Sequence, residues 1–579
     1  MLKLARYLRY FKKEVIIGPF FKLLEAIFEL IVPIVMASII DVGIKNRDTT
    51  FVLQRGGIIL LLGFMGLVFA IICQYSAARA SQGFGTMVRN DLYAHINSLS
   101  HGEIDKFGTS TLITILTNDI NQMQLAVAML IRLVVRVPFL IIGAVVMSMI
   151  LDLKLSLIFL IVAPLVSAVI YLIMRLSVPY YRVRQKMLDK VSTITRENLS
   201  GVRVIRAFSK QDHEIKRFNK ANNDVADIAI NVGKISAFLN PATFAILNIA
   251  ILTILWFGGG RVYTGSLTQG EVIALTNYMT QISLALVVLS NLVVIFTKAA
   301  ASANRINMVF ETEASIQEIE RSLTDIKIDN KEKSMTEQAL ISIDKVSFAY
   351  PGSDEYALED ISIDIRQGEV IGIIGGTGSG KSTLVNLLPR FYDVTKGEIR
   401  LNGIPLQEYS IDSIRKLFGI VTQKAVLFSG SISDNLRFSK EDASLEEIKW
   451  AIEVAQAKDF VEKLPDGYDT LINQGGRNLS GGQRQRLTIA RALVRKPKIL
   501  ILDDSFSALD YATDARLREA LSKNCRDTTV LIVSQRANTI KYADQIIVLD
   551  DGKVAGIGKH EDLYKSCHVY KEICDSQLS

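Results

Sequence analysis

Six long apolar stretches in the first half of this 579-residue chain constrain its fold more than any other feature. At about 1.5 Å rise per residue, each is long enough as a helix to cross a hydrocarbon layer roughly 30 Å thick. No comparable run follows residue 310, so we predict a membrane part followed by a soluble part. The six stretches are Val15–Ile40, Gly56–Tyr75, Val134–Leu151, Leu155–Met174, Pro241–Gly258 and Val272–Phe296.

Basic residues precede the first stretch. Lys3, Arg6, Arg9, Lys12 and Lys13 are interspersed with Leu, Tyr and Phe, which is typical of an amphipathic helix on the inner membrane face. Because positively charged flanks stay in the cytoplasm, we expect the N-terminus to be inside, and six crossings return the C-terminal half there. No small-residue cleavage site follows a short apolar core, so a cleavable signal peptide is not predicted.

Charge and cysteine content exclude other classes of protein. The net charge of +7 is small for this length, and basic cytoplasmic loops account for it, so no nucleic-acid partner is expected. Cys73, Cys525, Cys567 and Cys574 have no metal-type spacing. We expect them to be reduced and structural.

Two of the loops between the apolar stretches are long. Ser76–Ala128 and Arg175–Asn240 both face the cytoplasm in the expected orientation and have no proline-rich or low-complexity character. A helix of 25 residues is roughly 37 Å long, so these loops can be antiparallel helical extensions below the membrane. Their turns are predicted near Asp105–Thr114 and Gly201–Phe208, where a cytoplasmic motor can push.

The pattern changes after a charged linker at residues 311–338. Short apolar runs then alternate with helical segments, which is typical of an α/β sheet of the P-loop type. We therefore predict an α-helical six-span transmembrane domain at residues 1–310, fused to an α/β P-loop domain at 339–579. The predicted strands are Leu340–Tyr350, Ser362–Ile365, Val370–Ile374, Ile499–Leu502, Thr529–Val533 and Gln545–Leu549.

A phosphate-binding motif directly follows the third of these strands. Gly375–Ser382 reads GGTGSGKS, and its glycines let successive backbone N–H groups point at phosphates. Lys381 is predicted to reach the β and γ phosphates of ATP, and the Ser382 hydroxyl to bind Mg²⁺. After the apolar run Ile499–Leu502, Asp503 is placed to hold Mg²⁺ through water, and Asp504 points at the attacking water. Tyr350 can stack on adenine or belong to the core.

The order of these motifs resembles that of an ATP-binding cassette (ABC) domain. Six spans with long cytoplasmic loops ahead of it resemble a half-transporter of the bacterial multidrug exporter type, which implies a prokaryotic plasma membrane. The resemblance covers essentially the whole chain. It rests on Tyr350, GGTGSGKS, Gln423, LSGGQ at Leu479–Gln483, Asp503, SALD at Ser507–Asp510 and the position of Gln535.

The resemblance implies a head-to-tail dimer in which each ATP lies between the P-loop of one chain and the LSGGQ of the other. It also implies that Gln423 links Mg²⁺ and the water to the membrane part, that Asp510 lies at the dimer seam, and that turns near Phe107 and Val204 dock on the cassettes. The implied ATP contacts are Tyr350, Gly375, Gly376, Thr377, Gly378, Ser379, Gly380, Lys381, Ser382 and Thr383, with Ser480, Gly481, Gly482 and Gln483 from the other chain. Mg²⁺ would be held by Ser382, Gln423 and Asp503.

Three departures from the family pattern bear on the mechanism, two of them on hydrolysis and the third on cross-talk. Asp504 replaces the catalytic glutamate and is one methylene shorter, and a misplacement of about 1 Å can cost on the order of a hundredfold in rate. Gln535 replaces the switch histidine and cannot become a cation beside the γ-phosphate. Gln474 replaces a glutamate before LSGGQ. Binding residues and LSGGQ are intact, so we predict a slowly hydrolysing, degenerate site in a heterodimer whose partner carries Glu and His.

Two alternatives remain open at the level of sequence. Asp504 can still act as a general base in a slow homodimeric exporter, because Asp and Glu share their acid chemistry. A nucleotide-gated channel or regulatory receptor would use ATP binding without turnover. A soluble cassette protein is excluded by the six spans.

The cargo is only broadly indicated. The family resemblance implies export of amphipathic drugs or lipids. Lys22, Glu25 and Glu29 fall at helical spacing in the first span, as functional charges or as local pairs that offset burial. Arg132 and Arg136 are expected to snorkel near the cytoplasmic interface. Five further residues can line a cavity or pack the helices: Phe139, Phe244, Tyr278, Met279 and Phe296.

Overall fold

The computed structural model describes residues 2–316, 323 and 339–577, and most of the predicted linker lies outside them. The chain forms two compact units. A helical unit comprises residues 1–97 and 110–312, and a sheet unit comprises 98–109 and 313–579. Residues 98–109, which include the first part of the turn predicted near Asp105–Thr114, therefore cluster with the sheet unit.

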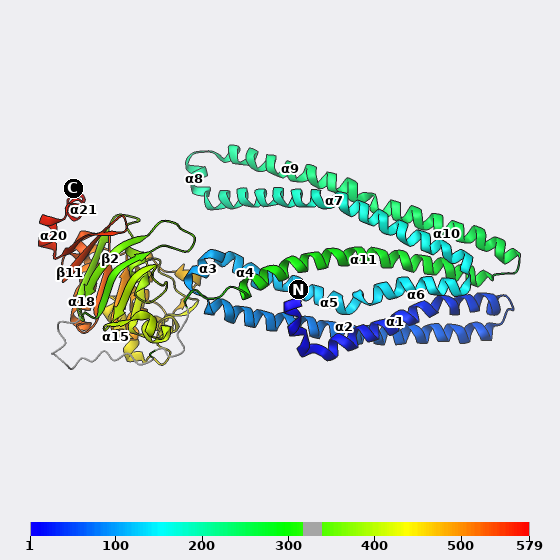
Figure 1. The fold of residues 1–579 in the computed structure, drawn as a ribbon, viewed down its shortest axis with the longest axis horizontal. Helices are drawn as coiled ribbons and strands as arrows, with labels where there is room; N and C mark the ends of the chain where they lie inside the picture. The colour runs from blue at the N-terminus through cyan, green and yellow to red at the C-terminus, as the bar shows by residue number, and fades with distance from the viewer. Residues whose placement is uncertain (1, 317–322, 324–338, 578–579) are drawn as a thin grey trace. The chain divides into compact units, whose positions relative to one another are not determined.

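The helical unit contains six helices long and apolar enough to cross a membrane (Figure 1). Each includes one of the six predicted stretches, which confirms the six-span architecture. The helices span Lys3–Ile44, Thr49–Ser98, Thr109–Leu151, Leu153–Ser200, Gln211–Tyr263 and Gln269–Phe310. Their named parts are α1 (Lys12–Ser38), α2 (Thr49–Ser98), α4 (Thr109–Thr114), α5 (Ile120–Met129), α6 (Arg136–Leu151), α7 (Leu153–Ser200), α9 (Gln211–Ala237), α10 (Leu239–Tyr263) and α11 (Gln269–Phe310).

Short irregular turns interrupt these helices. A 3₁₀ segment, η1 (Leu2–Phe11), precedes α1, so the basic N-terminal segment is helical as predicted. Three segments are π-helical, with one extra residue in the turn: η2 (Ile39–Ile44), η3 (Ile115–Asp119) and η4 (Leu130–Val134). π-Helical turns change which residues share a face, and they often occur at functional sites.

Helix α11 is the centre of the helical unit. Its Tyr278 is fully buried, and the Tyr278 hydroxyl donates a 2.6 Å hydrogen bond to the Leu30 carbonyl of α1. Buried Phe159 of α7 and Ala144 of α6 belong to the same core. Tyr278 and Met279 are therefore packing residues, as one of the two interpretations expected, whereas Phe244 is 60% exposed.

The charges of the first span are paired within the helical unit. Lys22 Nζ lies 2.7 Å from a Glu25 carboxylate oxygen, and Arg136 Nη2 lies 2.7 Å from Glu29 Oε2. The i, i+3 pairing expected for Lys22 and Glu25 is present. The Arg136 guanidinium extends across to α1, and its side chain is 22% exposed.

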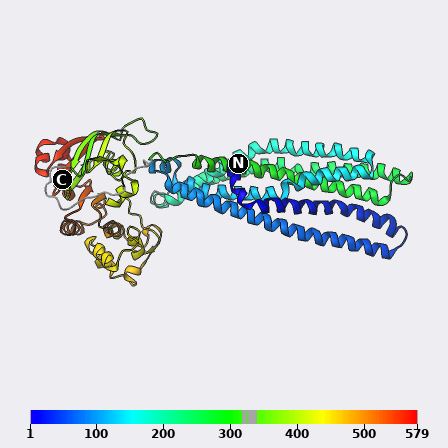
Figure 2. The same cartoon turned by 60° about the horizontal axis from the view of Figure 1, so that its bottom comes forward.

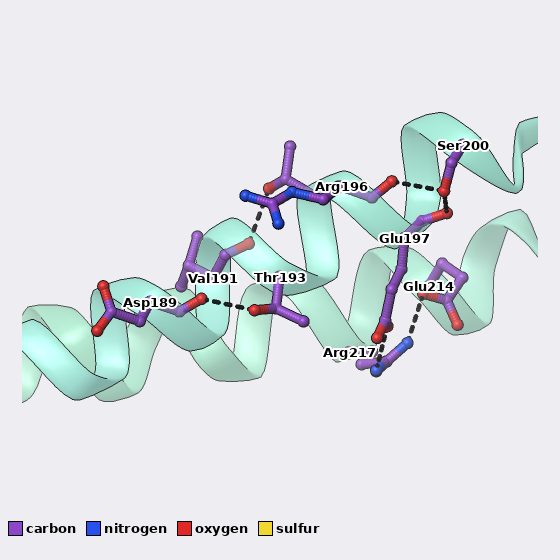
Figure 3. Close-up of polar contacts among 9 residues, drawn as sticks. Asp189, Val191, Thr193, Arg196, Glu197, Ser200, Glu214 and Arg217 are labelled. Atoms are coloured by element: carbon purple, nitrogen blue, oxygen red, sulfur yellow. Dashed lines mark hydrogen bonds and ion pairs between the residues drawn. The ribbon is translucent and has the colours of Figure 1, made fainter. Parts of the chain in front are cut away.

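The second long loop forms a helical hairpin, as predicted. Helices α7 and α9 run side by side and are joined by α8 (Val202–Ala207) (Figure 1). Near this turn, Arg217 of α9 contacts Glu197 of α7 at 2.8 Å and Glu214 at 3.3 Å (Figure 3). None of the α8 residues is buried, and Val204 is 61% exposed. The hairpin therefore holds a short exposed helix at its tip.

The first long loop is held to α11, the last helix of the helical unit, by an ion pair whose carboxylate is buried. Asp119 of η3 accepts hydrogen bonds from Arg305 Nε at 2.7 Å and from Ser302 Oγ at 2.9 Å, both on α11. Burial opposes ionisation of Asp119, but these donors keep its pKa below the ordinary value. The pair fixes the extension of the third span against that of the sixth.

The sheet unit contains a six-stranded sheet in the order β12-β11-β3-β10-β9-β6, parallel except for β12. A second, antiparallel sheet has the order β2-β1-β4-β5. The strands span β1 (Ile341–Phe348), β2 (Leu358–Ile365), β3 (Val370–Gly375), β4 (Lys396–Leu401), β5 (Ile404–Pro405), β6 (Phe418–Val421), β9 (Ile499–Asp503), β10 (Thr529–Val533), β11 (Gln545–Asp550) and β12 (Lys553–Gly558).

Helices form a separate part of the sheet unit (Figure 2). The yellow segment of Figure 2 contains α14 (Ile432–Arg437), α15 (Leu445–Val454) and α16 (Lys458–Val461), which pack with α17 (Gly481–Val494). A short two-stranded sheet, β7 (Gly430–Ser431) with β8 (Leu471–Ile472), closes this part. The remaining helices are α12 (Lys381–Leu387), α13 (Ile411–Leu417), α18 (Tyr511–Asn524), α19 (Ala537–Ile540), α20 (His560–Ser566) and α21 (His568–Ser576).

Candidate active site

The phosphate-binding loop lies between β3 and α12, at the carboxyl edge of the parallel strands. Its backbone needs glycine at Gly378 and Gly380, where φ is 85° and 91°, and a Cβ at Gly380 would lie 2.6 Å from Leu358. Lys381 Nζ donates to the Gly375 carbonyl at 3.0 Å and to the Gly376 carbonyl at 2.5 Å. The ammonium group thus lies over the loop, where phosphate oxygens would replace these carbonyls.

The predicted metal ligands converge beside this loop. Ser382 Oγ donates to Asp503 Oδ1 at 3.1 Å, joining the first turn of α12 to the end of β9. Hydroxyl and carboxylate oxygens at this spacing fit Mg²⁺, which prefers a few protein oxygens and keeps several waters. When bound, Mg²⁺ would supply positive charge that offsets the negative charge of the ATP phosphates. Ser382 and Asp503 would hold it, and Gln423 lines the same cavity.

Burial shapes the charges of this site. It raises the pKa of Asp503, with the adjacent Asp504 charge adding to the effect and Ser382 and Lys381 opposing it. Burial also lowers the pKa of Lys381, although both aspartates oppose that shift. The Lys381 ammonium and the Asp503 carboxylate are therefore both incompletely solvated. Such a pair favours binding of an anionic ligand together with its metal cation.

Asp504 has an unusual backbone conformation directly after β9. Its φ is 47°, in the left-handed region, where Asp is tolerated better than most residues. The Asp504 backbone N–H donates to the Val533 carbonyl at 3.0 Å, and Gln423 Nε2 donates to Asp504 Oδ2 at 3.4 Å. The carboxylate is therefore held at a fixed position, half-buried, with the Gln423 amide beside it.

One cavity of about 290 Å³ collects most of the predicted ATP and metal residues. Tyr350 lies at this cavity, where its hydroxyl is 3.0 Å from Thr383 Oγ1 and its ring contacts Phe348 and Tyr392. Gly375, Gly376 and Ser379 belong to the loop but do not line the cavity. The lining residues are Tyr350, Ala357, Thr377, Gly378, Gly380, Lys381, Ser382, Thr383, Gln423, Asp503, Asp504, Val533, Ser534 and Gln535. Ala357, Val533 and Ser534 were not predicted as site residues, although Val533 ends a predicted strand and Ser534 directly follows it.

The LSGGQ residues do not line this cavity. Ser480 is exposed and caps α17, where its hydroxyl accepts from the Gln483 backbone N–H at 3.2 Å. Gln483 Oε1 accepts in return from the Ser480 N–H at 2.8 Å. Asp510 caps α18 in the same way through Thr513. The chain thus presents an exposed helix N-terminus, suited to an anion, apart from its own P-loop.

The segment at residues 534–537, called the Gln535 segment here, is held by Gln577, the last residue that the structure describes. Gln577 Nε2 donates to the Gln535 carbonyl at 2.7 Å, and Gln577 Oε1 accepts from the Ala537 N–H at 2.8 Å. The Ser534 backbone N–H donates to Ile373 of β3 at 3.0 Å. Sequence reasoning missed Gln577 because nothing local to the end of the chain indicates contact with a strand end.

Helix α3 (His101–Phe107) packs on the sheet unit next to Tyr350. The His101 ring lies 4.4 Å from that of Phe391, and Tyr392 donates a 2.9 Å hydrogen bond to Asp105. The Tyr392 ring also contacts Tyr350, with centroids 5.4 Å apart. The turn expected near Phe107 thus forms a short helix in contact with the nucleotide unit, through two aromatic residues that the sequence did not single out.

Known proteins resemble the chain along its length. Residues 15–286 match the ABC transporter transmembrane region, and residues 358–507 match the ABC transporter family. The chain is 39% identical to YfiB of Bacillus subtilis, an uncharacterized ABC transporter ATP-binding protein, over 96% of this chain and 95% of that protein. It is 30% identical to the ATP-dependent lipid A-core flippase of Vibrio parahaemolyticus, over 99% of this chain and 96% of that protein. A bacterial Atm1-family ABC exporter solved with ATP bound has the same fold, with a TM-score of 0.82 at 23% identity, over 98% of this chain and 99% of that chain.

Proposed function

Because the chain belongs to the ABC transporter family and is a half-transporter with the exporter fold, we propose that it exports amphipathic small molecules or lipids as one subunit of a dimer. The cargo would leave the cytoplasm or the inner leaflet, with the N-terminus and the sheet unit in the cytoplasm. Mg²⁺-ATP drives the transport, and the site built on this chain's own P-loop hydrolyses it slowly.

The position of Asp504 is the observation that carries the proposal of slow hydrolysis. A glutamate at this position would reach further by one carbon–carbon bond, about 1.5 Å. The backbone of Asp504 is tied to Val533 and has a left-handed φ, so it cannot move forward to compensate. A shortfall of that size would cost on the order of a hundredfold in rate. Gln535, which also lines the cavity, offers a neutral donor where a cation would stabilise developing charge.

A second subunit is supported by what this chain presents at its surface. Its Ser480 helix N-terminus is exposed and does not line its own ATP cavity, as expected of a motif that serves the ATP of another chain. The exposed apolar side chains of Val204 and Phe208 at the tip of the second hairpin also fit a site that a partner covers. We propose that the partner is a different half-transporter with Glu and His at the positions of Asp504 and Gln535.

Turnover and oligomeric mass, measured on the chain alone in lipid discs, test this proposal. ATP binding with almost no turnover is expected. Introducing Asp504→Glu together with Gln535→His should raise hydrolysis by about tenfold or more, since both changes restore transition-state contacts. A stable homodimer of the unmodified chain turning over at about 1 to 10 per second, within the ordinary enzyme range, would contradict the heterodimer and favour the symmetric exporter.

A further inference from the structure

Five charged side chains gather inside the apolar part of the helical unit. Lys22, Glu25 and Glu29 lie on α1, whereas Arg132 lies on η4 and Arg136 begins α6. The two chain segments pack closely here, because a Cβ at Gly18 would lie 2.4 Å from Ile131 Cγ2. Helix α1 is in contact with η4, which brings Arg132 to the side of α1 along this stretch.

The cluster has one positive charge more than it can pair. Lys22 pairs with Glu25, and Arg136 pairs with Glu29. Arg132 remains, and its buried Nε has no hydrogen-bond partner among the residues that the structure describes. An unpaired cation among apolar helices is costly, so such residues generally serve a ligand or an ion.

Two other buried polar atoms around the same cluster lack partners within the described part of the chain. These are Arg136 Nε and Oε1 of Gln281 on α11. Gln281 belongs to the cluster because its Nε2 donates to the Glu29 carbonyl at 3.3 Å. Both arginines therefore have an unused donor, and buried donors ordinarily have partners.

An apolar groove of about 370 Å³ begins within one helical turn of the Arg136–Glu29 pair. Its walls are α1 and α6, which approach closely because Gly143 has no side chain: a Cβ there would lie 2.4 Å from Leu30 Cδ1. Arg132 lies two turns before Phe139, roughly 10 Å along the helix. The lining residues are Ile27, Leu30, Ile31, Phe139, Ile142, Gly143, Val146 and Met147.

We propose that this groove and Arg132 form a binding site for an amphiphile with an acidic headgroup, a phosphate or carboxylate on an alkyl chain. The headgroup pairs with Arg132 and takes the free N–H of Arg136, and the alkyl chain lies between α1 and α6. This inference rests on the proposed export of amphiphiles and specifies their charge. In the proposed orientation, the headgroup site is on the cytoplasmic side of the groove, as for an amphiphile entering from the inner leaflet.

Arg132 suits a test by mutation because its removal leaves no carboxylate unpaired, whereas removal of Arg136 would strand Glu29. Binding of dodecyl phosphate and of dodecyl maltoside is measured on the full chain in phosphatidylcholine discs. Arg132→Gln should weaken dodecyl phosphate binding about tenfold, the loss of one charge-assisted contact, and leave dodecyl maltoside unchanged. Arg132→Lys should retain most of the affinity. Arg175→Gln, which removes an exposed positive charge from α7, should change neither.

The unmodified chain gives a second measurement that needs no variant. Dodecyl phosphate should bind at least tenfold more tightly than dodecyltrimethylammonium, which has the same chain and the opposite charge. Equal binding of the two, or equal loss of both dodecyl probes in Arg132→Gln, would overturn the site. Inorganic phosphate binding as tightly as dodecyl phosphate would also overturn it, because the groove would then contribute nothing.

Failure of this inference is distinguishable from failure of the proposed function. ATP-driven movement of neutral or cationic amphiphiles, with no preference for acidic ones, would leave the exporter proposal standing and reject the acidic headgroup. Selective binding of dodecyl phosphate through Arg132, without ATP-driven movement of any amphiphile by the assembled transporter, would support the site and reject the exporter proposal.

Discussion

Asp503 and Asp504 are adjacent carboxylates at the end of β9 with different surroundings. Asp503 is buried against Ser382, whereas Asp504 is half-buried beside Gln423. Strand β9 ends at Asp503, and the left-handed φ of Asp504 turns the chain there, so the two carboxylates have different neighbours. In the proposed site, Asp503 serves the metal and Asp504 the attacking water. Because burial raises its pKa, Asp503 is the residue whose charge costs the protein stability until Mg²⁺ and ATP are bound.

Replacing Asp503 by Asn should separate stability from function. A raised folded-state pKa means that this carboxyl contributes stability fully below about pH 4, and the contribution is lost as the pH rises through the folded pKa. Asp503→Asn removes the unfavourable charge at pH 7. We expect the nucleotide-free Tm to rise by roughly 2 to 4 °C, the shift that about 1 kcal/mol produces in a domain of this size.

The same variant should lose at least tenfold in Mg²⁺-dependent ATP affinity, because a neutral amide replaces the carboxylate that faces the metal. Thermal unfolding at pH 7 and pH 4, with and without Mg²⁺-ATP, measures both effects. The Tm difference from the unmodified chain should shrink at pH 4. A variant less stable than the unmodified chain at pH 7, yet with normal Mg²⁺-ATP affinity, would show that Asp503 is a structural residue only.

At the scale of elements, α3 contacts the nucleotide unit through the hydrogen bond from Tyr392 to Asp105. Tyr392→Phe removes the hydroxyl that donates to Asp105 and keeps the ring that contacts Tyr350. In the assembled transporter, we expect basal ATP turnover to stay within twofold of that of the unmodified transporter. Stimulation of turnover by transported amphiphile should fall about threefold to tenfold, because the loss of one hydrogen bond costs a free energy in that range. Turnover with and without amphiphile measures this. Tyr511→Phe, at an exposed tyrosine, is the matched control. Equal loss of basal and stimulated turnover would contradict a role in coupling.

The end of α21 acts on the Gln535 segment. Gln577→Ala removes two hydrogen bonds that fix this segment beside the cavity, so the Gln535 side chain becomes less well positioned. In the Asp504→Glu, Gln535→His background, where turnover at this site is measurable, we expect kcat to fall about threefold to tenfold with KM unchanged. Glu561→Ala, an exposed change on α20, is the control. A raised KM with constant kcat would place Gln577 in ATP binding instead.

Long uninterrupted patterns made the helices and the P-loop predictable from sequence. Long apolar runs predict membrane spans. The GGTGSGKS motif predicts a strand–loop–helix turn, and the structure has glycines of this motif at positive φ, as such a turn requires. Strands such as β4 and β6 were missed because each is short and gains its stability from neighbours far along the chain. The contacts of Tyr392 with Asp105, of Gln577 with Gln535 and of Arg136 with Glu29 were missed for the same reason: each joins elements that no local pattern relates.

At the scale of the whole molecule, the proposed asymmetry makes the two ATP motifs of this chain unequal. Its LSGGQ would serve the fast site of the partner, whereas its P-loop forms the slow site. In the transporter assembled with its second half, Ser480→Ala should therefore lower total ATP turnover about tenfold or more. Lys381→Ala should lower it less than threefold, because the slow site contributes little hydrolysis of its own.

The control for Ser480→Ala must match its structural cost. Ser480 also caps α17, and losing a serine cap costs about 1 kcal/mol. Ser410→Ala removes a comparable cap from α13 without touching either ATP motif, so it should leave turnover unchanged. If Lys381→Ala abolishes turnover as fully as Ser480→Ala does, both sites hydrolyse in obligatory alternation. The dimer would then be symmetric in function, with Asp504 as an adequate base.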